Sequence, residues 1–283
     1  MDKTKIDWCD STWNPVTGCL HGCEYCYARS IAYRFSGHGE DWSDEDIHIL
    51  DKKIYGVEAE RSEPYPYGFE PTFHRYRLDE YQNKKGRNIF VCSMADLFGD
   101  WVPNSWIGDV FEACRKAPQH NYLFLTKNPK RYRQIITDNY RNGREVKMNN
   151  FWFGTTITNT YDIAYNGNEL SVDIEELSGL IEKFNTFISL EPLLGSLPTI
   201  AINWLMEFDW IIVGAETGRR KGKVIPERRW IQSIVEQCKM TGTPLFMKSS
   251  LADVWGEPLI QELPEGLRKG RLHCEHKRIC TSA

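Results

Sequence analysis

The sequence of 283 residues lacks the features that mark exported or membrane-embedded proteins. Its first residues, Met1 to Asp7, contain no apolar segment typical of a secretory signal, and no run of eighteen apolar residues occurs anywhere in the chain. The nine cysteines are an odd number in a long chain, which argues against a disulfide framework and for reduced thiols. We therefore expect a cytoplasmic protein that contacts no membrane.

The chain also lacks an excess of positive charge, internal repeats, low-complexity segments and any clear linker. With a formal net charge of −4, the molecule as a whole does not attract nucleic acid. Basic residues nevertheless outnumber acidic ones in two stretches, residues 127–147 and 219–229. Either stretch has the charge to hold phosphate groups, although solvated helix faces and loops explain them equally well.

Short apolar segments recur along the chain, and most are separated by helical patterns. They are rich in β-branched and aromatic residues, as is typical of strands buried on both faces of a parallel sheet. The predicted strands are Asn88–Cys92, Tyr122–Thr126, Phe151–Thr155, Thr186–Leu190, Trp210–Gly214 and Pro244–Lys248, after a first strand near Ile6–Cys9. This alternation predicts an α/β fold in which parallel strands form a barrel or a doubly wound sheet.

Two of the intervening helices are marked by apolar residues at positions i, i+3, i+4 and i+7, a spacing that faces the core. The two stripes are Ile107, Val110, Phe111, Cys114 and Ile231, Ile234, Val235, Cys238. Cys114 and Cys238 are therefore predicted to be core residues rather than metal ligands. Cys9 and Cys92 fall on predicted strands, and we interpret them as buried thiols.

Residues 1–283 are predicted to form a single barrel domain. Within it, residues 36–87 fit no strand and helix repeat, because an acidic first half is followed by an aromatic half rich in proline. We interpret them as an insertion that covers part of the barrel, either by plain packing or as a substrate lid or stacking platform for bases. Residues 264–283 form a basic C-terminal tail, in which Cys274 and Cys280 either bind a second metal or lie in a frayed terminus.

Three further cysteines stand close together near the N-terminus. Cys19, Cys23 and Cys26 have the spacing C-x3-C-x2-C, which is short enough for three thiolates to converge on one inorganic centre. A closed zinc site or an all-cysteine cluster takes four ligands, so three cysteines leave one coordination position open. The alternatives are a zinc site that also uses His21 and a set of unrelated buried thiols.

This loop, with the aromatic Tyr25 directly before the last cysteine, resembles the signature loop of the radical S-adenosylmethionine (SAM) superfamily. The wider string from Trp13 to Arg29 is similar to the three-cysteine-motif radical SAM proteins that are common in phage genomes. The resemblance implies a parallel (β/α) partial barrel, which typically has six strands. With seven predicted strands, either one lies outside the core or the barrel closes further.

The resemblance also implies the cofactors. In the superfamily the three thiolates hold three irons of a 4Fe-4S cluster, and the fourth iron binds SAM. By this resemblance, Cys19, Cys23 and Cys26 are the metal ligands, and SAM is the cofactor. A one-electron donor of the flavodoxin or ferredoxin type is expected as a partner.

In barrels of this class, functional residues collect at the carboxyl ends of the strands. The polar residues that follow the predicted strands include Ser93, Asp96, Thr156, Glu191 and Glu216. By resemblance, the turn from Ser93 to Asp96 stands where the superfamily carries a Gly-Gly-Glu motif that contacts the SAM amino group. This sequence lacks that motif, which leaves the contact to Asp96 or to backbone carbonyls.

The other SAM contacts are also assigned by resemblance. Thr156 or Glu191 is expected at the ribose, and Glu216 and Tyr25 are expected along the adenine. For each of these residues, a salt bridge or a helix cap at the barrel rim is the alternative interpretation.

The sequence thus leads to the hypothesis of a radical SAM enzyme that cleaves SAM reductively to a 5′-deoxyadenosyl radical, which abstracts hydrogen from a substrate. The basic stretches, the aromatic segment and the resemblance to phage proteins favour a nucleobase, in nucleic acid or in a nucleotide. A peptide or a small metabolite is the alternative substrate. A non-catalytic, metal-stabilised module that binds nucleic acid or a protein is the alternative from another functional class.

Overall fold

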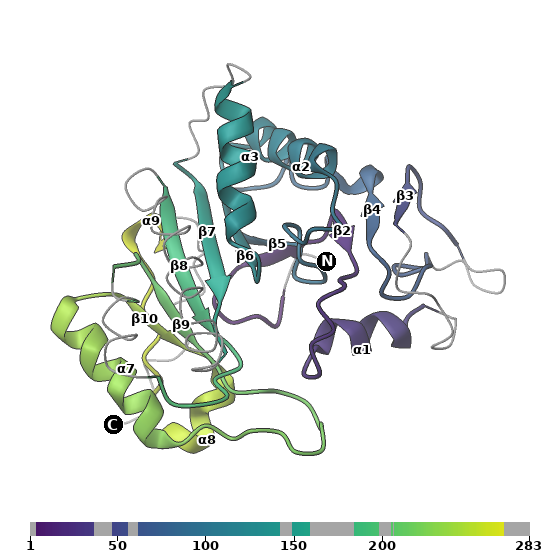
Figure 1. The fold of residues 1–283 in the computed structure, drawn as a ribbon. Helices are drawn as coiled ribbons and strands as arrows, with labels where there is room; N and C mark the ends of the chain where they lie inside the picture. The colour runs from purple at the N-terminus through teal and green to yellow at the C-terminus, as the bar shows by residue number, and fades with distance from the viewer. Residues whose placement is uncertain are drawn as a thin grey trace, which may run out of the picture.

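The computed structural model describes residues 4–36, 47–55, 62–141, 149–158, 184–197, 205 and 207–268. Seven parallel strands from these residues form one curved sheet in the order β1-β5-β6-β7-β8-β9-β10 (Figure 1). The strands are β1 (Ser11–Trp13), β5 (Asn88–Val91), β6 (Asn121–Thr126), β7 (Phe151–Thr156), β8 (Asn185–Leu190), β9 (Ile211–Val213) and β10 (Leu245–Met247). Six of the seven predicted strand regions therefore contribute to a single sheet, and the α/β class is confirmed.

The first predicted strand was placed too early. Residues 6–9 form no strand, and β1 begins at Ser11, where it pairs with β5. Trp8 instead turns into the barrel interior, where its ring lies 4.7 Å from that of Phe90. Asp10 aligns the two strands, because its carboxylate accepts the backbone N–H of Asn88 at 2.7 Å. The sequence did not predict β1 because Ser11 and Thr12 are polar. The position of this strand is set by its tertiary contacts with β5.

The side chains of each strand alternate between two cores. One core fills the inside of the barrel, and its large side chains are Trp8, Phe90, Leu123, Trp152, Phe187, Trp210 and Phe246. Gly154 on β7 makes room for Phe187, since a Cβ there would lie 2.4 Å from the ring. This inner core leaves little space below the carboxyl ends of the strands.

The outer core lies between the sheet and the helices that cover its convex face (Figure 1). These helices are α2 (Asn104–Lys116), α3 (Lys130–Arg141) and α7 (Arg228–Thr241). Every residue of the two predicted apolar stripes on α2 and α7 is buried, including Cys114 and Cys238. Cys92 is also buried but lies one residue beyond β5, whereas Cys9 is only partly buried and lies on no strand, which corrects that prediction.

The amino-terminal end of the barrel is closed by α9 (Glu265–Arg268). Asn88 and Asn121, the first residues of β5 and β6, donate to the carbonyls of Leu267 at 2.8 Å and Gly266 at 3.1 Å. Leu267 is fully buried in the inner core. The short helices η2 (Ser249–Leu251) and α8 (Ala252–Trp255) follow β10 at the opposite end.

A second, smaller sheet lies beside α1 (Tyr27–Arg34), at the right of Figure 1. It has the order β2-β4-β3 and consists of β2 (Val16–Thr17), β4 (Thr72–His74) and β3 (His48–Leu50), followed by η1 (Arg75–Arg77). Both β3 and β4 come from the segment 36–87. The division of the chain into a barrel, an insertion and a tail stays a prediction. Cys274 and Cys280 lie outside the described residues.

Among the described residues, no helix combines the length and the apolar character that crossing a bilayer requires.

Candidate functional site

A cavity of about 600 Å³ opens at the carboxyl ends of the parallel strands. Its lining includes every residue that the sequence suggested for the cluster and for SAM: Cys19, Cys23, Cys26, Tyr25, Ser93, Asp96, Thr156, Glu191 and Glu216. The fold thus brings together one N-terminal loop and the ends of β5, β7, β8 and β9. The remaining walls are largely apolar and include Trp8, Tyr65 and Phe69.

The cysteine loop, residues 18–26, is held by its backbone against two neighbouring segments. The N–H of Gly18 donates to the carbonyl of Met94 at 2.9 Å, and the N–H of Cys19 donates to that of Phe69 at 3.2 Å. Gly18 has a φ of +86°, and a Cβ at this position would lie 2.1 Å from the carbonyl oxygen of Glu70. Only glycine permits this close approach, which fixes where the loop begins.

The loop ends at the start of a helix. Cys26 is the N-cap of α1, and its Sγ accepts the backbone N–H of Arg29 at 3.4 Å. Burial raises the pKa of Cys26, while the N–H groups of Arg29 and Ala28 lower it. A helix N-terminus favours a negatively charged group, so Cys26 is positioned to become a thiolate once a cation is close.

The three thiols influence one another across the cavity. Burial raises the pKa of Cys19 to about 12, and nearby Asp96, Cys26 and Cys23 add to that shift. Thiolates in such a place need a positive charge, which a metal centre supplies. In the part of the chain that the structure describes, no three His, Cys, Asp or Glu side chains are already arranged as a metal-binding set. The three cysteines therefore remain a proposed ligand set.

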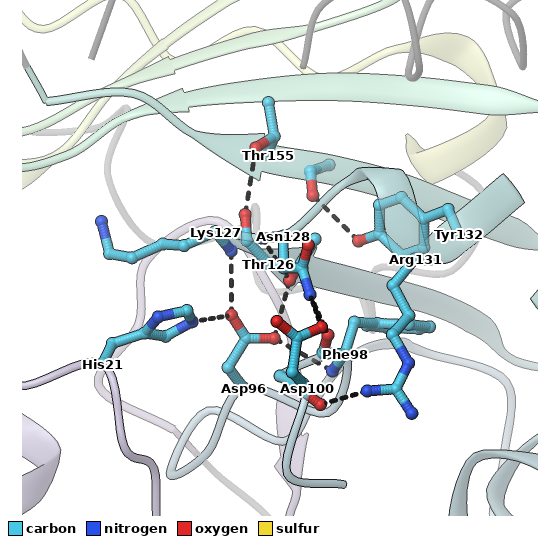
Figure 2. A network of polar contacts seen from close by, with 12 residues as sticks. His21, Asp96, Phe98, Asp100, Thr126, Lys127, Asn128, Arg131, Tyr132 and Thr155 are labelled. Carbon is cyan, nitrogen blue, oxygen red and sulfur yellow. Dashed lines mark hydrogen bonds and ion pairs between the residues drawn. The ribbon is translucent and has the colours of Figure 1, made fainter. Parts of the chain in front are cut away.

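Asp96 connects the cysteine loop to the ends of β5 and β6 (Figure 2). Its Oδ1 accepts the N–H of Phe98 at 3.0 Å and the hydroxyl of Thr126 at 2.7 Å. Its Oδ2 accepts the N–H of Lys127 at 2.9 Å and lies 2.7 Å from Nε2 of His21. A carboxylate offers about four acceptor sites, so these bonds occupy them. His21, the extra ligand of the zinc alternative, is here hydrogen-bonded to Asp96.

The loop that carries Asp96 is anchored from outside the cavity (Figure 2). Asn128 donates to the carbonyl of Phe98 at 3.0 Å and to the carboxylate of Asp100 at 2.9 Å. The buried guanidinium of Arg131 donates to the carbonyls of Gly99 and Val102. These hydrogen bonds hold the turn after Asp96 without any contact from the cavity side. They therefore keep Asp96 in one position.

Lys127 makes a second connection between β6 and the cysteine loop. Its Nζ donates to the hydroxyl of Tyr25 at 3.1 Å and lies 5.5 Å from the centre of the Tyr25 ring. Burial raises the pKa of Tyr25, which the charge of Lys127 opposes. Lys127 is one of the polar residues that follow the predicted strands, but its position after a strand gave no sign of its partner.

Glu191 and Lys248 form an ion pair inside the cavity, at the ends of β8 and β10. They meet across Gly214, which follows β9 between them. A Cβ on Gly214 would lie 2.9 Å from Cδ of Lys248 and 3.2 Å from Cδ of Glu191. Lys248 also stands at the end of a predicted strand, and its partner was likewise not predicted. The available signal was two strands of one sheet, β8 and β10, that are followed by opposite charges.

Glu216 is buried and bound on both oxygens by Arg220, at 2.7 and 2.8 Å. The hydrogen bonds from Arg220 lower the pKa of Glu216. Arg220 also lies 3.5 Å from Glu24 on the cysteine loop. The loop after β9 is thus fixed beside the cysteine loop, and it exposes Arg219, Lys221 and Lys223 to solvent.

The turn after β5 contains an unusual backbone conformation at the cavity wall. Cys92 has a φ of +58°, which is rare for a residue with a side chain. Asn14 stabilises the turn, because its Oδ1 accepts the N–H of Met94 at 3.0 Å and the hydroxyl of Ser93 at 3.2 Å. Thr156, which ends β7, is partly buried and lines the cavity.

Comparison with known proteins gives one family and a set of similar folds. The family model described as "Protein of unknown function (DUF5131)" matches residues 3–266. No curated protein matches the chain. A double mutant of spore photoproduct lyase with bound AdoMet and dinucleoside spore photoproduct is similar in structure, with a TM-score of 0.50 and 9% identity, over 86% of this chain and 78% of that chain.

A single mutant of the same lyase with dinucleoside spore photoproduct has a TM-score of 0.49 and 10% identity, over 82% of this chain and 74% of that chain. Spore photoproduct lyase is a radical SAM enzyme. At such low identity the first similarity shows the fold alone. The predicted parallel partial barrel of the radical SAM type is thereby confirmed, here with seven strands.

Proposed function

The chain belongs to the DUF5131 family, and we propose that it is a radical SAM enzyme. One observation carries the proposal: three cysteines from one loop line the same cavity as the residues that follow the parallel strands. In barrels of parallel strands, this end carries the chemistry. The likeness of the fold to spore photoproduct lyase supports the same conclusion. The phage-associated branch stays a prediction, since the family description names no branch.

Cys19, Cys23 and Cys26 are the proposed ligands of a 4Fe-4S cluster. Burial, with smaller contributions from Asp96 and the neighbouring thiols, raises the pKa of Cys19, and a cationic iron centre offsets that effect by binding the thiolates. Three cysteines leave one iron free for another ligand. When bound, the cluster supplies the electron that cleaves SAM to the 5′-deoxyadenosyl radical, which takes hydrogen from the substrate.

The residues of the chain itself bind SAM and the substrate, orient them and exclude water. Asp96 and Glu216 use their oxygens within the protein, so we assign them the task of holding the loops around the cavity. Ser93, Thr156 and Tyr25 remain the proposed contacts for SAM. The aromatic walls keep water from the reacting atoms.

We propose a nucleobase, in nucleic acid or in a nucleotide, as the class of substrate. The exposed basic side chains of Arg219, Lys221 and Lys223 follow β9 close to the cavity and suit a phosphate backbone. Spore photoproduct lyase, whose fold is similar, binds a dinucleoside. If nucleic acids and nucleotides all leave the rate of SAM cleavage unchanged, a peptide or small metabolite takes precedence.

The test is the formation of 5′-deoxyadenosine by anaerobically reconstituted protein that is given SAM and a strong reductant. We expect the wild type to form this product and Cys23→Ala to form none. Cys238→Ala is the matched control, because that thiol is buried on α7 away from the cavity. A wild type that binds metal but forms no 5′-deoxyadenosine would favour the non-catalytic, metal-stabilised module instead.

A further inference from the structure

The inner face of β8 carries a polar group at the bottom of the cavity. Phe187, Ser189 and Glu191 alternate along this face, so that Phe187 lies in the inner core while Ser189 and Glu191 line the cavity above it. Below Ser189 the barrel is filled with aromatic side chains. Ser189 therefore lies where the inner core meets the cavity.

The hydroxyl of Ser189 is unusual because it is buried and unsatisfied. The residue has a relative exposure of 0%, and its Oγ makes no hydrogen bond with any part of the chain that the structure describes. Burying a hydroxyl without a partner is unfavourable, and such groups in native proteins are few. An orphaned hydroxyl where the inner core meets a cavity points to a ligand that binds it.

Two further polar groups stand above Ser189 on the same wall. Glu191 and Lys248 are ion-paired, with side-chain exposures of 24% and 16%. Gly214 lies between their strands, and its missing side chain is what allows the pair to form inside the barrel. The ammonium donates hydrogen bonds, the carboxylate accepts them, and the hydroxyl can do both.

The hydroxyl, the carboxylate and the ammonium together favour one chemical class of ligand. The charges of Glu191 and Lys248 cancel, and a phosphate or carboxylate placed there would meet the carboxylate of Glu191. A neutral group with donors and acceptors on one edge matches the wall better. The nearby apolar walls of Trp8, Phe90 and Leu125 suit a flat ring rather than a flexible polar chain.

We propose that Ser189, Glu191 and Lys248 form the subsite that receives the edge of a nucleobase inside the barrel. The inference rests on the proposed function and deepens it. It assigns this wall to the substrate, whereas the cysteine loop is assigned to the cluster and SAM. Glu191, expected at the SAM ribose by resemblance, is thereby reassigned to the substrate. Enzymes that act on a base read it by hydrogen bonds to its edge and by apolar contact with its faces.

The experiment measures binding of single nucleosides to the full-length protein by equilibrium dialysis, for each common ribonucleoside and deoxyribonucleoside. We expect at least one to bind the wild type, and Ser189→Ala and Lys248→Met to weaken that binding about tenfold or more. SAM affinity should change less than about twofold, since no SAM contact is lost. Ser233→Ala and Lys239→Met, both exposed on α7, are the matched controls.

The thermal unfolding temperature of each variant shows whether weaker nucleoside binding comes from a lost contact or from a folding defect. Because the hydroxyl of Ser189 is unsatisfied, Ser189→Ala should unfold at the same temperature as the wild type or higher, while its nucleoside binding falls. A merely structural serine would lose stability instead.

The inference is overturned if no nucleoside binds the wild type, if both variants bind nucleoside like the wild type, or if SAM affinity falls as much as nucleoside affinity. The proposed function fails separately. If nucleoside binding depends on Ser189 and Lys248 but the protein forms no 5′-deoxyadenosine, the proposed reaction is contradicted and the proposed nucleobase subsite is supported.

Discussion

The carboxylate of Asp96 holds together three parts of the chain that the sequence separates: the cysteine loop, the turn after β5 and the end of β6. The sequence marked Asp96 as a cavity residue, but its partners depend on the fold. The same is true of Lys127 and Lys248, whose roles follow from Tyr25 and Glu191. Sequence reasoning found which residues face the cavity and missed which of them bind one another.

Asp96→Asn should therefore destabilise the protein. Asparagine keeps one acceptor oxygen and replaces the other with a donor, which cannot accept from the N–H of Lys127. We expect the free energy of unfolding to fall by about 2–3 kcal/mol, as for buried hydrogen bonds to a charged group. Urea denaturation measures this. Asp109→Asn, exposed on α2, is the control, and equal stability of Asp96→Asn and wild type would contradict the assigned role.

His74 makes stability depend on pH. It is fully buried, its Nε2 lies 2.8 Å from the hydroxyl of Thr17, and its Nδ1 lies 3.4 Å from that of Tyr76. Burial, with the nearby charge of Arg77, lowers the pKa of His74 from 6.5 to about 3. Between these two values the unfolded chain binds a proton that the folded protein does not, so stability falls as the pH drops.

We expect this group to remove about 2 kcal/mol of stability between pH 7 and pH 5. Urea denaturation at the two pH values, for the wild type and His74→Gln, measures the difference, because the variant lacks the titrating group. A variant whose stability changes with pH as steeply as that of the wild type would contradict the assignment to His74.

At the scale of elements, the cysteine loop depends on backbone contacts more than on side chains. Gly18 and Gly22 both have positive φ, but only Gly18 lies against another backbone. We expect Gly18→Ala to cost about 3 kcal/mol or more, because strain and a clash with the carbonyl of Glu70 add together. Gly22→Ala should cost about 1 kcal/mol, since a Cβ there meets nothing within 4 Å.

The comparison of these two variants by urea denaturation separates the clash from the strain. Equal costs would mean that the close approach of Gly18 to Glu70 does not fix the loop.

Most elements followed from local pattern. Six of the seven strands were predicted within a few residues, because strands buried on both faces form nearly continuous apolar runs. The apolar stripes of α2 and α7 were correct because residues at positions i, i+3, i+4 and i+7 share one face of a helix. β1 was misplaced because Ser11 and Thr12 give it a polar surface, and the positive φ of Cys92 has no local signature.

At the scale of the whole molecule, the barrel is closed at one end and open at the other. Leu267 fills the amino-terminal end, where hydrogen bonds from Asn88 and Asn121 hold α9. Among the residues that the structure describes, the groups proposed to bind the cluster, SAM and the substrate therefore collect at the carboxyl end. This closure joins residues about 180 positions apart in the sequence. No local sequence pattern predicts a contact at that separation.

The proposed reaction requires an iron–sulfur cluster with one iron that SAM can reach. The most direct measurement is the electron paramagnetic resonance spectrum of anaerobically purified, reduced protein, before and after SAM is added, together with its iron and sulfide content. We predict about four irons per chain and a 4Fe-4S signal that SAM changes. Bound zinc without iron, or a cluster signal that SAM leaves unaltered, would contradict the account.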